Sequence, residues 1–213
     1  ANRDPRLGMT IVYNDMVWPA KAKVEIWEGG ENGLPLNNAT TTGYYLRKYV
    51  NKDISFVSGS TSTKKHHNWI LFRYAEVLLN YAEAMTNAFG PDYTDAQFPI
   101  SAREAVNQVR KRSDVNMPEL PAGMSKADFL ERLKNERRVE LAFEGHRFWD
   151  VRRWKDLNQT ANIYGVKVKK TDSGFSYDKF LYETRTITDN LYFYPISNTE
   201  KYKNPSLGQN PGW

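Results

Sequence analysis

The chain has 213 residues, 40% of them hydrophobic and 26% charged, which is typical of a folded globular protein and not of a disordered one. It contains no cysteine, which excludes disulfides, thiolate catalysis and cysteine-based zinc sites. The net charge of +5 raises nucleic acid as a partner, but the basic residues are interleaved with acidic ones, as in residues 136–140. We interpret them as a solvated or paired helix face and expect no nucleic-acid partner.

Residues 1–68 are rich in turn-forming residues. A short strand-like run covers residues 9–13, and stretches dense in glycine and asparagine follow at residues 28–33 and 37–40. Residues 58–63 contain only serine, glycine and threonine, which is typical of a loop tip. We therefore expect residues 1–68 to form a loop-rich segment.

Two tryptophans, Trp18 and Trp27, lie in this loop-rich segment. An exposed indole offers a flat apolar face on which a sugar ring can stack, and nearby asparagine and glutamate side chains can bind hydroxyl groups. The alternative is that both indoles fill gaps between the loops and a helical core. Trp18 and Trp27 are the predicted ligand-binding residues.

A helical core is predicted over residues 69–157, and its first helix over residues 69–89, because this run lacks glycine and proline and Gly90 and Pro91 follow it. At helical spacing Phe72 and Leu79 fall nearly opposite the main apolar face, so the helix is expected to lie between two layers. That main face is expected to contain Ile70, Leu71, Tyr74, Val77, Leu78, Tyr81, Met85 and Phe89.

A second helix is predicted over residues 101–113, with Ala102, Ala105, Val106 and Val109 as its buried stripe. Two helices joined by a loop form a hairpin of the kind stacked in tetratricopeptide-like arrays. No second copy appears at a fixed period, so an array would lie mostly upstream. The predicted fold class is mainly α, with a tetratricopeptide-like helical hairpin core, long loops and a small β-hairpin region near the C-terminus.

A third helix is predicted from Ser125, which forms a capping-box pattern with Asp128, to about Phe143, and Gly145 interrupts it before a short continuation over residues 146–154. Three tryptophans within the helical segment, Trp69, Trp149 and Trp154, are expected in the core. So are the apolar residues of the third helix, Phe129, Leu130, Leu133, Leu141 and Phe143.

Several charged residues fall on the apolar side of this third helix, where unpaired charges would be costly. One interpretation is a carboxylate pair for glycoside hydrolysis. The other is a structural ion network, which we favour because arginines near the carboxylates lower a carboxyl pKa, whereas a general acid needs a raised one. The predicted network contains Arg73, Glu76, Glu136, Arg137, Glu140, Glu144, Arg147 and Asp150. No catalytic residue is predicted.

Residues 158–213 are predicted to form a hairpin and an extended tail. Residues 164–170 alternate in polarity, residues 171–174 form a turn, and Phe175 begins the return strand. Residues 191–194 are predicted as a further strand, and the terminal Trp213 is expected to fill a crevice. His66 and His67 are adjacent and lack the i, i+4 spacing of a helical metal pair, and no nucleotide-binding motif occurs, so neither a metal nor a cofactor is expected.

Several long segments resemble the SusD/RagB family. The longest is NERRVELAFEGHRFWDVRRW at residues 135–154, and FRYAEVLLNYAEA at residues 72–84 resembles a family helix. The segments DPRL at residues 4–7 and GYYLRKY at residues 43–49 also match, as does the ending from Pro195 to NPGW. The matches keep their order over nearly the whole chain, although Ser197 and Asn80 depart from common family residues.

The resemblance implies a non-catalytic surface protein of Bacteroidetes that captures glycans or peptides and passes them to a SusC-like TonB-dependent transporter. It implies that this chain is the C-terminal part of a longer polypeptide, whose N-terminal half carries a lipid anchor and places the protein on the outer face of the outer membrane. The alternatives are a helical-repeat interaction scaffold and a glycoside hydrolase.

Overall fold

The computed structural model describes residues 3–17, 23–51, 65–66 and 68–213. This part of the chain contains six α-helices and two antiparallel strand pairs, and it divides into two compact units, each built from two separate stretches of chain. The first unit comprises residues 1–25 and 44–147, and the second comprises residues 26–43 and 148–213.

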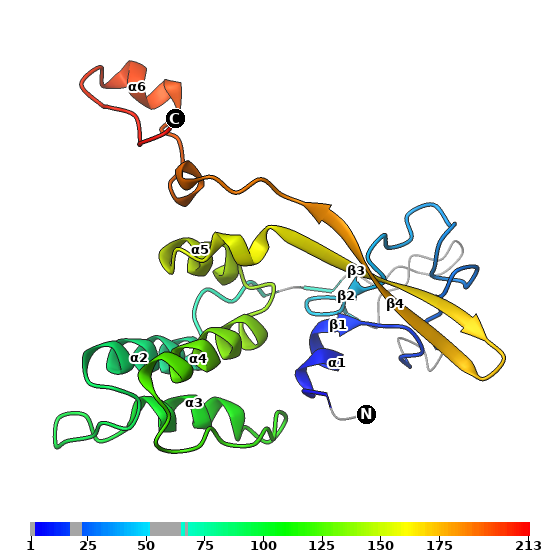
Figure 1. Ribbon diagram of the computed structural model, residues 1–213, viewed down its shortest axis with the longest axis horizontal. Helices are drawn as coiled ribbons and strands as arrows, with labels where there is room; N and C mark the ends of the chain where they lie inside the picture. The colour runs from blue at the N-terminus through cyan, green and yellow to red at the C-terminus, as the bar shows by residue number, and fades with distance from the viewer. Residues whose placement is uncertain (1–2, 18–22, 52–64, 67) are drawn as a thin grey trace. The chain divides into compact units, whose positions relative to one another are not determined.

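The core of the first unit is a three-helix layer in which α2 (Tyr74–Ala88) packs against both α3 (Ala102–Arg110) and α4 (Lys126–Glu140) (Figure 1). Serine side chains cap two of these helices. Ser101 Oγ accepts the Glu104 amide at 3.1 Å, and Ser125 Oγ accepts the Asp128 amide at 3.1 Å, so the predicted start of the third helix is confirmed.

Small side chains are among the most deeply buried in this layer. The predicted stripe of α3 is confirmed, because its alanines and valines are fully buried. The side of α2 that faces α3 and α4 likewise carries small residues beside larger ones. The shared core contains Ala75, Leu78, Leu79, Ala82, Met85, Ala105, Val106, Phe129, Leu133 and Leu141.

The prediction for α2 was partly wrong. Residues 69–73 are not helical, because Arg73 has an extended backbone and α2 begins at Tyr74. Leu79, expected opposite the core face, is fully buried, whereas Tyr74 and Val77 are exposed. The reason is that close packing against α3 selects the alanine-containing side of α2, and the helical wheel ranked large apolar residues above alanine.

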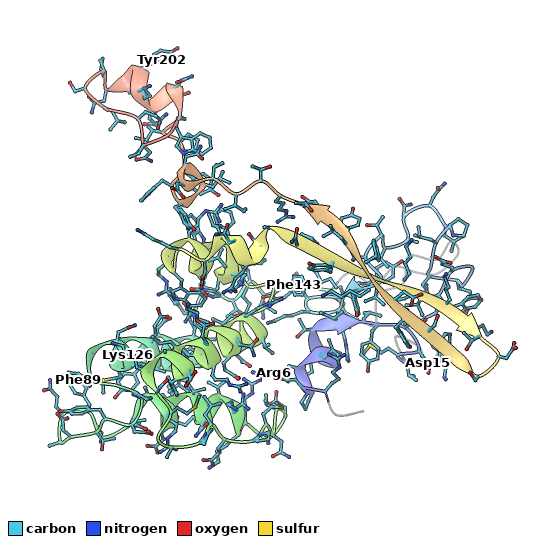
Figure 2. The ribbon with its side chains drawn as sticks, in the orientation of Figure 1. Arg6, Asp15, Phe89, Lys126, Phe143 and Tyr202 are labelled. Carbon is cyan, nitrogen blue, oxygen red and sulfur yellow. The ribbon has the colours of Figure 1, made fainter. Side chains whose placement is uncertain are left out.

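Three aromatic residues expected in the core lie elsewhere. Trp69 precedes α2 and is 67% exposed, and Trp149 is on a helix but 59% exposed. The third helix ends at Glu140 and not at Phe143, which adopts φ +62° in the turn that follows and is 53% exposed (Figure 2). Trp154 is half-buried.

The remaining elements of the first unit are short. The helix α1 (Arg6–Thr10) leads into β1 (Ile11–Val12), which pairs antiparallel with β2 (Tyr45–Leu46). The backbone amides of Arg47 and Lys48 both donate to Thr10 O, at 3.0 and 3.1 Å. These bonds fix the ends of two distant loop segments beside each other.

The second unit is organised around a long hairpin of β3 (Asn162–Thr171) and β4 (Gly174–Thr184), whose predicted turn and return strand are confirmed. Phe180 lies across the strand from Gly165, where a β-carbon would come within 2.7 Å of the phenyl ring. A glycine at this position therefore lets the aromatic ring cover the strand.

The other elements of this unit precede and follow the hairpin. The helix α5 (His146–Arg153) begins in the first unit and continues in the second, and η1 (Leu157–Thr160) leads into β3. After β4 come η2 (Asp189–Tyr192) and α6 (Asn198–Lys203). The predicted strand at residues 191–194 was wrong, because the Leu191 amide donates to Thr188 O and closes a 3₁₀ turn.

Candidate functional site

The loop of residues 26–43, which carries Trp27, is held against the free edge of β3. The Glu28 amide donates to Val168 O at 2.9 Å, and the Val166 amide donates to Thr42 O at 2.9 Å. Gly43, at φ +81°, is needed for this approach, because a β-carbon there would lie 2.1 Å from Val166 O. The loop is therefore fixed at both ends by strand-like hydrogen bonds.

Trp27 is half-buried on this loop and sits beside a cation. The Lys170 ammonium lies 4.9 Å from the centre of the Trp27 ring, within cation–π range. The ring also packs against Gly29, where a β-carbon would be 3.4 Å from its edge. Glu28, the next residue, is exposed. An accessible part of an indole and a cation thus lie together, and a residue with an exposed carboxylate follows directly in the chain. Trp18, the other predicted ligand residue, lies outside the described residues.

A small cavity separates the loop from the hairpin, with a volume of about 40 Å³. This space suits a single water molecule and is far too small for a sugar ring. Any glycan at this site would therefore lie on the surface around Trp27 and would not enter the fold. The cavity wall includes Ile26, Leu34, Thr40, Val166 and Phe180.

Lysines pair with aromatic rings elsewhere along the same hairpin. The Lys179 ammonium lies 3.9 Å from the centre of the Tyr164 ring, and the Lys167 ammonium lies 5.3 Å from that of Phe180. Tyr164 and Tyr177 are exposed. The alternating pattern predicted the strands, but single-strand periodicity could not show which lysine meets which ring across the hairpin.

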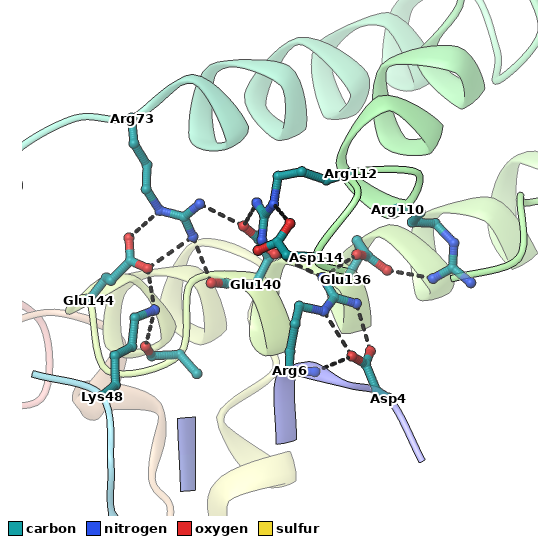
Figure 3. A network of polar contacts seen from close by, with 11 residues as sticks. Asp4, Arg6, Lys48, Arg73, Arg110, Arg112, Asp114, Glu136, Glu140 and Glu144 are labelled. Carbon is teal, nitrogen blue, oxygen red and sulfur yellow. Dashed lines mark hydrogen bonds and ion pairs between the residues drawn. The ribbon is translucent and has the colours of Figure 1, made fainter. Parts of the chain in front are cut away.

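A buried ion network connects five segments of the first unit, with Glu140 at its centre (Figure 3). The Glu140 side chain is 2% exposed and accepts hydrogen bonds from Arg6 at 2.9 Å, Arg73 at 2.6 Å and Arg112 at 2.7 Å. Each of these arginines comes from a different part of the chain. Glu140 therefore holds α4 against α1, the start of α2 and the end of α3.

The neighbouring carboxylates complete the network. Glu136 accepts from Arg6 and from Arg110, each at 2.6 Å. Glu144 accepts from Arg73 at 2.7 and 2.9 Å and from Lys48. With Asp4 bound to Arg6 and Asp114 bound to Arg112, the cluster joins five cations to five carboxylates: Arg6, Lys48, Arg73, Arg110 and Arg112 with Asp4, Asp114, Glu136, Glu140 and Glu144.

Not all predicted network residues meet in this cluster. The Glu76 carboxylate lies 3.7 Å from His146 Nε2. Arg137 donates to Asn80 Oδ1 at 2.6 Å. Asp150 accepts a hydrogen bond from Arg153 at 2.9 Å. Arg147 lies in the first turn of α5.

Sequence reasoning missed six members of the cluster: Asp4, Arg6, Lys48, Arg110, Arg112 and Asp114. Arg6 and Lys48 lie in the segments at residues 4–7 and 43–49, which resemble the SusD/RagB family. That resemblance is the sequence signal that could have identified them.

The charge environment of Glu140 is unsuited to acid catalysis. Burial alone would raise the pKa of this carboxyl, but the hydrogen bonds from Arg112, Arg73 and Arg6 lower its pKa to about 2. The pKa of Glu144 is also lowered, because the bonds from Arg73 and Lys48 outweigh burial. Both carboxylates are ionised at neutral pH, whereas a general acid must hold a proton there.

The lowered pKa of Glu140 predicts acid sensitivity. A carboxyl whose pKa is about 2 in the folded protein and 4.5 otherwise stabilises the fold fully above pH 4.5, and that stabilisation is lost as the pH falls towards 2. Urea unfolding of the wild type and of Glu140→Gln, measured from pH 6 to 2.5, should give free energies that converge as the pH falls. A difference between the two proteins that stays constant across this range would contradict the assignment.

Within the described residues, no group of three or more histidine, aspartate or glutamate side chains is placed to hold a metal ion. Among the helices so described, none has the length and apolar character needed to cross a bilayer.

Comparison with known proteins gives one consistent result. A sequence model of the SusD family matches residues 1–213. SusD-like protein P38 of Formosa agariphila is 41% identical over 104 residues, which cover 46% of this chain and 18% of that protein. SusD-like protein P2 of the same organism is 27% identical over 166 residues, which cover 74% of this chain and 28% of that protein.

A solved structure agrees with these sequences. A SusD-like protein from Bacteroides fragilis superimposes with a TM-score of 0.77 at 29% identity, covering 99% of this chain and 39% of that chain. The chain thus spans less than a third of the curated relatives and about two fifths of the solved one.

Proposed function

Because the chain belongs to the SusD family, we propose that it is part of a non-catalytic, cell-surface protein that binds glycans or related nutrients. The observation that carries this proposal is the match of the family model to the whole of residues 1–213. The helical hairpin of α2 and α3 would then belong to a tetratricopeptide-like array of the whole protein.

The proposal extends to how the bound nutrient is used. The whole protein would lie on the extracellular face of the outer membrane, attached by an N-terminal lipid, and would deliver its ligand to a SusC-like TonB-dependent transporter. No cofactor is needed, because capture and release require no covalent step. The lowered pKa of Glu140 supports a binding role over a hydrolytic one.

The surface around Trp27 is the proposed contact for the glycan in this chain. A sugar ring could stack on the accessible part of the indole, while Glu28 and Lys170 bind its hydroxyl groups. The two hydrogen bonds that tie the loop to β3 support this role, because a fixed loop loses little entropy when a ligand binds.

A panel of soluble polysaccharides tests the function directly. In affinity gels containing starch, xylan, mannan or galactan, the protein should be retarded by at least one polymer, and incubation with that polymer should release no reducing ends. Release of reducing ends that is lost on Glu140→Gln would overturn the non-catalytic assignment. Absence of retardation by every polymer would overturn glycan binding.

Trp27→Ala should weaken binding to the retarding polysaccharide by about 1–3 kcal/mol, the usual scale for an aromatic anchor, and leave the melting temperature unchanged. The matched control is Trp69→Ala, which removes an exposed indole from the other unit. Equal affinities of the two variants would place the glycan elsewhere. A lower melting temperature for Trp27→Ala would assign Trp27 to packing instead.

A second candidate function is a helical-repeat interaction scaffold, which the outer side of α2 favours. Leu71 and Phe72 precede the helix, Tyr74 and Val77 lie on it, and all four side chains are exposed. Apolar surface of this kind commonly marks an interface. The same affinity gels separate the two functions, because a scaffold would not be retarded by polysaccharide.

A further inference from the structure

An open cleft lies near the end of the second unit, between the turn after α5, η2 and the C-terminal turn. Its volume is about 420 Å³. This volume lies within the range of roughly 300–1,000 Å³ that small-molecule sites usually have. It shares no lining residue with the surface around Trp27. The cleft is lined by Lys155, Asp189, Asn190, Tyr192, Phe193, Pro211 and Gly212.

The C-terminal wall of this cleft is fixed by side chains that bind the backbone of the preceding segment. Trp213 Nε1 donates to Asn190 O at 3.0 Å and to Phe193 O at 3.1 Å. Gln209 accepts the Ile196 amide at 2.8 Å and donates to Ile196 O at 3.0 Å. The terminal tryptophan, which was expected to fill a crevice, is 47% exposed and instead anchors the wall through its ring nitrogen.

Two further contacts set the shape of the cleft. Gly212, at φ +84°, lies so close to η2 that a β-carbon would come within 2.7 Å of Asn190 Cβ. On the other side, the Tyr192 hydroxyl donates to Lys155 O at 3.0 Å and holds the turn after α5. The cleft is therefore formed before any ligand arrives, which reduces the entropy lost on binding.

The side chains that line the cleft combine an apolar ring with charges of both signs. Phe193 is 60% exposed, so its ring is accessible for stacking. Within the described part of the chain, neither the Lys155 ammonium nor the Asp189 carboxylate has a hydrogen bond or ion pair, so both are available to a ligand. An apolar face beside a hydrogen-bond donor and an acceptor suits a sugar ring, which has apolar faces and hydroxyl groups at its edge.

We propose that this cleft is a second sugar-binding subsite, in which a pyranose ring stacks on Phe193 and its hydroxyl groups bind Asp189 and Lys155. The inference rests on the proposed glycan-binding function and adds a contact separate from Trp27. Two subsites on one chain would let a polysaccharide bind at two points, so that the loss of one contact does not release it.

The test uses the full chain and the polysaccharide that retards it in affinity gels. Phe193→Ala should lower the affinity about five- to thirtyfold, the usual result of losing an aromatic anchor worth about 1–2 kcal/mol, with no change in melting temperature. Asp189→Asn, which keeps the size of the side chain, should also lower it. Gly212→Ala should lower it without altering any polar group, because its methyl group would displace the C-terminal wall.

Matched controls and outcomes make the two proposals separable. Tyr202→Ala removes another exposed aromatic ring from the same unit, and Asp172→Asn removes another exposed carboxylate, and both should bind as the wild type does. Wild-type affinity in both Phe193→Ala and Asp189→Asn would overturn the subsite and leave the proposed function standing. Absence of binding by the wild type to every polysaccharide would overturn both.

Discussion

Glu140→Ala should lower the free energy of unfolding by about 3–5 kcal/mol, the usual consequence of removing one partner from a buried ion pair. The side chain is 2% exposed and accepts hydrogen bonds from three arginines. Its removal leaves an excess of positive charge around a buried position. The loss should be measured as a shift in the midpoint of urea unfolding at neutral pH.

Glu131→Ala is the matched control, because it makes the same substitution on the same helix. Glu131 is exposed and pairs only on the surface with Lys134 at 3.0 Å, so its removal should change stability by less than about 1 kcal/mol. Arg138→Ala, also on the outer side of α4, should change it by no more than about 0.5 kcal/mol. Equal losses for Glu140→Ala and Glu131→Ala would mean that α4 is rotated from the position described.

Arg6→Ala should lower the free energy of unfolding by about 3 kcal/mol, at the lower end of the range for a buried pair. Arg6 bonds to Asp4, Glu136 and Glu140, but both glutamates keep other arginine partners when it is removed. The effect should be large because Arg6 is 4% exposed and is the residue through which α1 reaches α4. Thermal and urea unfolding of the purified variant measure it.

Two further variants define what Arg6 contributes. Arg6→Lys should recover only part of the loss, because an ammonium group cannot reproduce the fork of a guanidinium that bonds three carboxylates. The double variant of Arg6→Ala with Glu140→Ala should lose less stability than the sum of the losses in the two single variants, because the two residues are bonded to each other. Fully additive losses would show that they act independently.

The sequence was most informative where a pattern depends on neighbouring residues. The serine cap at Ser125 and the turn between β3 and β4 follow from local hydrogen bonding and backbone geometry, and both were predicted. The buried stripe of α3 followed from spacing alone, because alanine and valine alternate there with charged residues. Each of these features is decided within a few residues.

Features that depend on distant segments were predicted less well. A helical-wheel projection of α2 could not show which side faces α3. It therefore placed Tyr74 and Val77 in the core, although both are exposed. The three-helix layer determines that choice. Carboxylates on the inner side of α4 were recognised as needing partners, but Arg6 lies 134 residues before Glu140 and nothing in the spacing joins them.

In the candidate ligand surfaces, too, the parts set by neighbouring residues were predicted and the parts set by distant segments were not. Trp27 was selected for its position among turn residues, but the cation beside it, Lys170, comes from the far end of β3. The C-terminal cleft was missed, because its wall depends on Trp213 bonding to the backbone of η2. The sequence indicated a crevice-filling role for Trp213, but it could not show that the ring nitrogen bonds to two backbone carbonyls.

The arrangement of the ion network also bears on the order in which the chain folds. Glu140 joins partners that lie 28, 67 and 134 residues away along the chain. Closing such loops costs entropy before any contact forms, so we expect these bonds to form after the local packing of α2 with α3. Contacts that are absent from the transition state slow unfolding more than they speed folding. The network should therefore chiefly slow unfolding and so prolong the lifetime of the folded state.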